Sequence, residues 1–189
     1  TTKKIFLDLG HIGIFRKLIE STNLKNDQKK QIKKLIKSKS SSEIKKYLNN
    51  IKVSEDFKDC ISSFPKMHGS IKNIRKNLDQ LKYFNSDIEN DIDHMINLGN
   101  LVGTKHTDVQ INYDFCKLQG FDYENDIIFS AYIENDSEEV ALGGKYNCSE
   151  NNTSGIGFSV DVRYLLKNQP VEKKLINKLG KWIIESNNE

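Results

Sequence analysis

IFLDLGHIGIFR, residues 5–16, is the stretch of sequence that decides the fold. Residues 5–9 form a short, mostly apolar run that is typical of a β-strand, and Gly10 and Gly13 flank a turn. Apolar side chains then recur with the spacing of a helix, at Ile14, Phe15, Leu18 and Ile19. The stretch therefore predicts a strand, a glycine turn and a helix. Because a strand needs a hydrogen-bonded neighbour, we expect a later strand to pair with it.

Residues 22–99 are predicted to be a helical insertion within a single domain that spans residues 1–189. Ser41 or Ser42 can cap one helix, Ser54 can cap the next, and Phe64-Pro65 breaks the run. No convincing strand interrupts this region. The apolar stripes on which this prediction rests are Ile32, Leu35 and Ile36; Ile44, Tyr47, Leu48 and Ile51; Phe57, Cys60 and Ile61; Ile71, Ile74, Leu78 and Leu81; and Ile88, Ile92, Met95 and Ile96.

After Gly103 the apolar period changes from that of a helix to that of a strand. Residues 109–115 alternate between apolar and polar side chains, and residues 127–133, 138–142 and 155–160 are further predicted strands. Residues 134–137 are a hairpin signal. A short helix is expected around Leu165, and an amphipathic helix is expected to close the chain beyond Pro170. The order of elements predicts an α+β fold, with a mostly antiparallel sheet and a helical insertion.

Composition places the chain among folded, water-soluble proteins. With 189 residues, 37% hydrophobic and 29% charged, it is long enough for one domain with a core. Its apolar runs are far shorter than the ~20 residues of a membrane helix, and no signal-peptide pattern follows the start, so a cytoplasmic location is expected. The three cysteines are widely spaced, which indicates packing residues rather than disulfides or a metal clamp: Cys60, Cys116 and Cys148.

The net charge of +3 conceals a marked asymmetry along the chain. Residues 25–46 hold nine lysines against two acidic residues, whereas residues 108–150 hold ten acidic residues against two lysines. The basic stretch is consistent with contact to nucleic acid or to an acidic partner. A solvated helix face is favoured, because no arginine or aromatic residue is interleaved among these lysines as stacking on nucleic acid requires.

Familiar catalytic signatures are missing from the sequence. The four histidines lie far apart and match no metal-binding spacing, and neither a GxSxG motif nor a phosphate-binding loop occurs, so neither a metal nor another cofactor is expected. Two glycine-containing segments stand out instead, QGFDY at 119–123 and ALGGKY at 141–146. Each is expected at a strand end or turn, where glycine lets backbone approach a ligand and tyrosine supplies a wall with a hydroxyl.

These segments resemble the motifs of the histidyl-tRNA synthetase family, whose members have the class II aminoacyl-tRNA synthetase fold. Residues 5–16 resemble its "LGHVGIFR" strand, turn and helix. Residues 118–123 with 127–132 resemble its first histidine-binding motif, residues 142–147 its second, and residues 155–161 the third class II motif. Residues 64–69, FPKMHG, resemble the "LPELYGG" of a branch that lacks synthetase activity, the regulatory subunits of ATP phosphoribosyltransferase.

Departures from the family pattern favour this regulatory branch. Gln119 stands where the synthetase has the arginine that contacts the histidine carboxylate, and Tyr164 stands where it has the arginine that grips ATP phosphates. Glutamine and tyrosine cannot neutralise developing phosphate charge. Asp161 also replaces a glycine, and Arg163 lies one residue from the expected arginine position, so a shifted alignment would restore that cation. The resemblance thus implies a chain that is not an enzyme.

The resemblance implies a partner, a pathway and a pocket. Regulatory subunits of this branch assemble with a short-form ATP phosphoribosyltransferase catalytic subunit in the first step of histidine biosynthesis, so a hetero-oligomer is expected. Glu124 replaces the second tyrosine of a pair in the first motif, and its carboxylate can accept a hydrogen bond from imidazole or ammonium. The implied candidates for histidine binding are Gln119, Gly120, Asp122, Tyr123, Glu124, Gly143, Gly144 and Tyr146.

Two other interpretations stay open at this stage. A degenerate or split histidyl-tRNA synthetase domain would catalyse histidine-dependent pyrophosphate exchange. An RNA-binding module would depend on Lys29, Lys30, Lys33 and Lys34, and its affinity would fall steeply with salt. The family carries its first two class II motifs ahead of the strand at residues 5–9, and this sequence shows neither. We therefore expect either a truncated regulatory subunit or a piece of a longer one, whose first strand is short of a partner.

Overall fold

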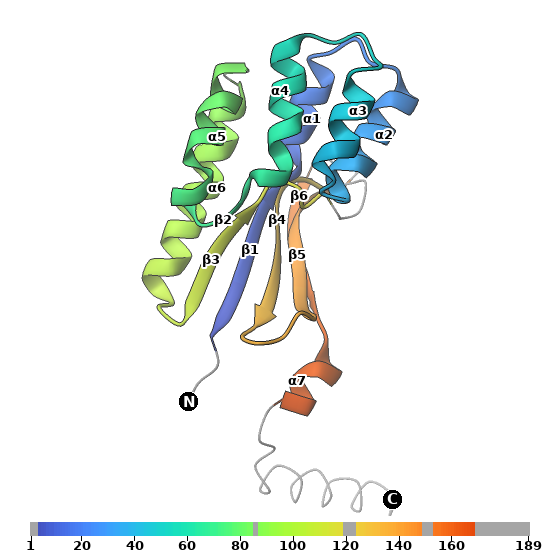
Figure 1. Cartoon of the computed structure of the whole chain (residues 1–189). Helices are drawn as coiled ribbons and strands as arrows, with labels where there is room; N and C mark the ends of the chain where they lie inside the picture. Colours follow the sequence, from blue (N-terminus) through green and yellow to red (C-terminus); the bar gives the residue numbers. More distant parts are fainter. Residues whose placement is uncertain (1–3, 85–86, 119–123, 149–152, 169–189) are drawn as a thin grey trace, which may run out of the picture. The chain divides into compact units, whose positions relative to one another are not determined.

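The computed structural model describes residues 4–84, 87–118, 124–148 and 153–168. The chain divides into two units, Thr1–Ser159 and Val160–Glu189. Six described strands form one sheet in the order β2-β3-β1-β4-β5-β6 (Figure 1). Their bounds are β1 Ile5–His11, β2 His68–Gly69, β3 Val109–Asp114, β4 Glu124–Ile133, β5 Glu139–Cys148 and β6 Thr153–Val160.

The strand predicted at residues 5–9 is central in this sheet. β1 pairs with β3 on one side and with β4 on the other, so the expectation that it would be short of a partner is wrong. The β1–β4 pair is antiparallel, but the β1–β3 pair is parallel. Parallel neighbours need a long crossover connection, and the helices between β1 and β3 supply it. The sheet is consequently mixed rather than wholly antiparallel.

All the described helices of the first unit lie between β1 and β3 in the sequence. The prediction of helices across this region is confirmed, except that the two-residue strand β2 interrupts it and pairs with β3. Ser54 caps α4 by accepting a hydrogen bond from the Phe57 N–H at 3.2 Å, whereas Ser40, not Ser41 or Ser42, precedes α3. The helices are α1 Ile12–Glu20, α2 Asn26–Lys37, α3 Ser41–Leu48, α4 Glu55–Ser63, η1 Phe64–Lys66, α5 Ile71–Phe84 and α6 Asp87–Lys105. The 22–99 domain boundaries stay a prediction.

The two faces of the sheet differ in chemistry. Leu9 of β1 belongs to the hydrophobic core, as do Ile127 of β4 and Tyr113 of β3. Successive side chains along a strand point to opposite faces of the sheet. The residues that alternate with these core residues on each strand therefore point to the other face. Through the strand register, that face carries Phe6, Asp8, Asn112, Ser130 and Tyr132, and we call it the polar face. None of the described helices is long and apolar enough to span a bilayer.

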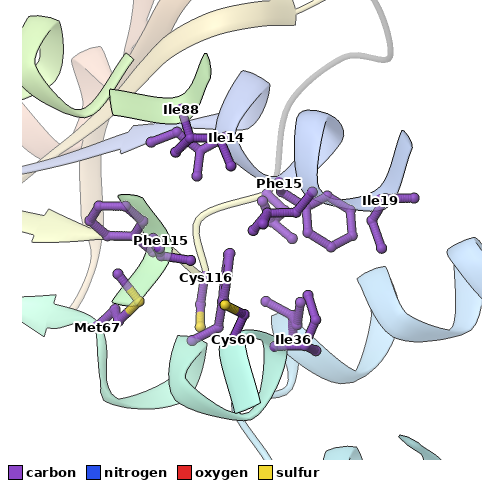
Figure 2. Packing of buried hydrophobic residues seen from close by; sticks show 14 of the residues in the cluster. Ile14, Phe15, Ile19, Ile36, Cys60, Met67, Ile88, Phe115 and Cys116 are labelled. Carbon is purple, nitrogen blue, oxygen red and sulfur yellow. The ribbon is translucent and has the colours of Figure 1, made fainter. Parts of the chain in front are cut away.

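The core joins α1 to the other helices of the crossover (Figure 2). Cys60 and Cys116 lie in it, and burial raises the pKa of Cys60 to about 11 and that of Cys116 to about 12. Both are free thiols, which confirms the predicted packing role for these two cysteines. The side chain of Cys148 lies outside the described residues.

We expect neither core thiol to react with iodoacetamide in the folded protein at about pH 8, because only the thiolate attacks and both pKa values lie far higher. A Cys148→Ser variant isolates the two core thiols. Mass spectrometry should find no adduct until urea unfolds the protein, after which both thiols should be modified. Rapid native labelling would contradict the buried positions.

Candidate functional site

The candidate histidine-binding residues that the structure describes lie on β4 and β5. Gly143, Gly144 and Tyr146 belong to β5, and the backbone of Glu124 opens β4 directly opposite Tyr146. The structure thus sets Glu124 of the first predicted histidine-binding motif opposite Tyr146 of the second. The remaining candidates lie outside the described residues: Gln119, Gly120, Asp122 and Tyr123.

The Gly143-Gly144 pair lies inside a strand, which corrects the expectation of a strand end or turn. A methyl group on Gly143 would lie 2.6 Å from Cβ of Phe158 and 2.8 Å from Cζ of Phe129. One on Gly144 would lie 2.7 Å from the carbonyl oxygen of Ile127. Glycine is therefore needed here because β4 and β6 approach β5 too closely for any side chain.

Tyr146 packs over the glycines of β6. A Cβ atom on Gly155 would lie 2.7 Å from Cζ of Tyr146, and one on Gly157 would lie 3.3 Å from its Cε1. The third-motif glycines therefore make room for the tyrosine ring of the second motif. Because Gly144 and Tyr146 are two residues apart on β5, they share one face of the strand and Lys145 points to the other.

A chain of polar side chains, two of them charged, lies where β1, β4 and β5 meet. Nε2 of His11 lies 3.1 Å from Oδ1 of Asp126, and Nζ of Lys145 lies 2.5 Å from Oδ2 of the same carboxylate. The Ile127 N–H also donates to Asp126 Oδ1 at 2.8 Å. Burial alone would raise the pKa of Asp126, but the hydrogen bonds from Lys145 and Ile127 lower it. This carboxylate therefore fixes β1 and β5 to the start of β4.

His11 is almost fully buried, with its side chain 5% exposed. Burial lowers its pKa, while the charges of Asp91 and Asp126 partly offset that shift, and His94 and Lys17 reinforce it. Lys17 Nζ lies 2.7 Å from Asp91 Oδ2, so α1 and α6 are held together beside the histidine. Its Nδ1 atom has no hydrogen-bond partner among the described residues. The neutral imidazole is thus the form that the fold favours.

Acid is expected to destabilise the protein through His11. Its pKa is lowered on folding, so the unfolded chain binds more protons below the ordinary histidine pKa of about 6.5, and stability is lost as pH falls through that value. Urea unfolding between about pH 8 and pH 5.5 should show a smaller loss in His11→Gln than in the wild type. His68→Gln, at an exposed position, is the control and should follow the wild-type curve. Identical pH slopes for all three proteins would contradict the assignment.

The second unit begins with the helix α7, Val162–Asn168. Asp161 accepts a hydrogen bond from the Tyr164 N–H at 3.0 Å through its Oδ1 atom. This is the geometry of a helix N-cap, a contact that contributes about 1 kcal/mol. Asp161 thus has a structural role at the start of α7, which is the short helix predicted around Leu165.

The spacing of residues along the sequence does not predict the His11–Asp126–Lys145 chain. Among the described residues, no three His, Cys, Asp or Glu side chains are grouped to hold a metal, and His11 pairs instead with Asp126. The three residues come from separate strands, so no local pattern connects them. The one available signal was Asp126, an acidic residue next to an apolar strand.

A sequence model described as histidyl-tRNA synthetase matches residues 1–165. The chain belongs to the histidyl-tRNA synthetase family. Within this family it is similar to the ATP phosphoribosyltransferase regulatory subunit of Oceanobacillus iheyensis, with 25% identity over 164 residues. That match covers 85% of this chain and 40% of the relative. This family member therefore spans well under half the length of such relatives.

Solved structures of the family share the fold. An ATP phosphoribosyltransferase regulatory subunit/histidyl-tRNA synthetase from Bacillus halodurans superimposes with a TM-score of 0.73 at 13% identity, covering 87% of this chain and 44% of that one. A chain of the ATP phosphoribosyl transferase (HisG:HisZ) complex from Thermotoga maritima gives a TM-score of 0.59 at 18% identity, covering 84% and 54%. The predicted class II synthetase-like fold is confirmed, with the sheet mixed.

Proposed function

We propose that this chain acts as a regulatory subunit, or part of one, of ATP phosphoribosyltransferase, in the first step of histidine biosynthesis. The observation that carries the proposal is the similarity to regulatory subunits over 85% of the chain. The family match by itself would also fit a synthetase. The names of the similar relatives favour the regulatory branch, and the sequence departures at Gln119 and Tyr164 agree with them.

We propose that this chain has no adenylation activity of its own. Gln119 and Tyr164 supply no positive charge where a synthetase neutralises carboxylate and phosphate. A degenerate or split synthetase would instead catalyse histidine-dependent exchange of pyrophosphate into ATP. We expect no exchange above background with this chain. Exchange that depends on both histidine and the chain would favour the synthetase alternative.

The proposed partner is a short-form catalytic subunit, in a hetero-oligomer in the cytoplasm. The Thermotoga maritima complex supports this choice, since one of its chains has the same fold as this one. Light scattering after size exclusion is the direct test of assembly. Mixing the chain with the catalytic subunit should give a species heavier than either component. Two separate peaks at micromolar concentrations of both would contradict the proposed partner.

Histidine is the proposed ligand, bound near Tyr146 and Glu124. The pairing of these residues across β4 and β5 supports one pocket built from both motifs. If the Tyr146 hydroxyl contacts the imidazole, Tyr146→Phe should weaken histidine binding about tenfold, the loss typical of one hydrogen bond. Calorimetry on the assembled complex measures it. Tyr47→Phe, on α3, is the matched control and should bind like the wild type. Equal affinities for wild type and Tyr146→Phe would contradict the contact.

A further inference from the structure

A cleft of about 620 Å³ lies on the polar face of the sheet, beside the β4–β5 hairpin. Its volume is within the range of small-molecule sites. The walls include Phe6 and Asp8 of β1, Asn112 of β3, Tyr132 of β4, and Asn135 and Asp136 of the hairpin. Neither lysine nor arginine is among the lining side chains, whereas two carboxylates are. The cleft is thus negatively charged and partly aromatic.

The aromatic walls are a cross-strand pair. Phe6 and Tyr132 lie directly opposite each other in the β1–β4 register, on the same face as Asp8. Aromatic rings attract cations that lie within about 6 Å of the ring centroid. One cation already lies near this ring: Lys117 Nζ is 6.0 Å from the centroid of Tyr132.

Asp8 is oriented in the cleft by a neighbouring amide. The two residues are register partners on β1 and β3, and Asn112 Nδ2 donates to Asp8 Oδ1 at 3.2 Å. The nearby lysines are engaged elsewhere in the described structure. Lys117 Nζ lies 3.2 Å from Glu139 Oε2, and Lys39 Nζ lies 2.7 Å from Asp114 Oδ2. Asp8 therefore receives an amide hydrogen bond from Asn112, while Lys39, whose ammonium group also interacts with the charge of Asp8, forms its ion pair with Asp114.

We propose that this cleft binds a small organic cation, a protonated amine or a guanidinium, with its charge against Asp8 and its alkyl part between Phe6 and Tyr132. Charge-assisted hydrogen bonds to carboxylate and contact with aromatic rings are the two interactions that recognise such groups. Asn135 and Asp136 supply further polar atoms at the rim. The site is separate from Gly144 and Tyr146, which do not line it, so the proposal goes beyond histidine binding.

n-Butylguanidinium is the probe, and n-butanol is its neutral counterpart. Titration of the whole chain should shift the side-chain amide resonance of Asn112, which reports directly on Asp8, and n-butanol should not. Asp8→Asn should weaken binding about tenfold or more, because it removes the charge. Asp27→Asn, which removes the same charge in the first turn of α2, should bind like the wild type.

Three further variants separate recognition from folding. Asn112→Asp adds a carboxylate beside Asp8 and should strengthen binding several-fold, a gain that misfolding cannot produce. Tyr132→Leu should weaken binding, whereas Tyr132→Phe keeps the ring and should retain it. Equal binding of butanol and butylguanidinium, an unmoved Asn112 amide, or wild-type affinity in Asp8→Asn would each overturn the proposal.

Discussion

Replacing Phe64 with alanine is expected to lower the free energy of unfolding by about 3–5 kcal/mol, the largest effect of any single substitution considered for this chain. The Phe64 side chain is 1% exposed. Its ring meets the edges of Phe15 of α1, at 6.3 Å between centroids, and of Phe115 after β3, at 6.4 Å. The substitution leaves a cavity where α1, η1 and the segment after β3 meet.

Urea unfolding followed by circular dichroism measures this loss. Leu101→Ala is the matched control, because Leu101 is 52% exposed on α6 and its truncation should change stability by less than about 0.5 kcal/mol. Phe64→Leu keeps most of the side-chain volume and should cost less than Phe64→Ala. If Phe64→Ala and Leu101→Ala lost the same stability, Phe64 would not occupy the centre of the core.

Gly143→Ala should be the second large effect, with a loss of about 1–3 kcal/mol, because the added methyl group overlaps atoms of both neighbouring strands. The atoms nearest to this methyl group include Cβ of Phe158 and the backbone of Gly157. These atoms are fixed to the backbone of β6 and cannot move aside as the end of a flexible side chain can. The same measurement of urea unfolding applies. Distortion here also displaces the strand that carries Tyr146.

Gly103→Ala is the control for this substitution and has the opposite expected sign. A methyl group on Gly103 would lie 3.7 Å from the nearest atom, Cγ1 of Ile111, which is ordinary contact. Alanine favours a helix over glycine by up to about 1 kcal/mol, so α6 should gain stability. Equal losses for Gly143→Ala and Gly103→Ala would mean that the close approach of β4, β5 and β6 is not the reason for glycine.

The fold could be predicted wherever its signal is local. Residues 5–16 form the predicted strand and helix, because apolar spacing acts within a few residues, but the predicted glycine turn between them is wrong: Gly10 lies in β1 and Gly13 in α1. The parallel pairing of β1 with β3 was not predictable from spacing, because it depends on where the crossover returns the chain. β5 is longer than the strand predicted at residues 138–142, because Gly143 and Gly144, which are typical of turns, here permit close packing of strands.

The candidate site was only partly predictable for the same reason. Motif resemblance placed Glu124 and Tyr146 in one pocket, and the β4–β5 register sets them opposite each other. The His11–Asp126–Lys145 chain joins three strands far apart in sequence, so only the folded structure reveals it. The cleft beside Asp8 likewise combines β1, β3 and the β4–β5 hairpin.

The most direct test of the proposed function is the turnover of a short-form ATP phosphoribosyltransferase catalytic subunit, measured with and without this chain. The account predicts that adding the chain to saturation raises the rate, and that histidine then lowers it, because histidine binds the two states of the assembly with different affinities. The matched control is bovine serum albumin at the same concentration, which should leave the rate unchanged. A rate that the chain does not change, at concentrations that saturate any complex, would contradict the account.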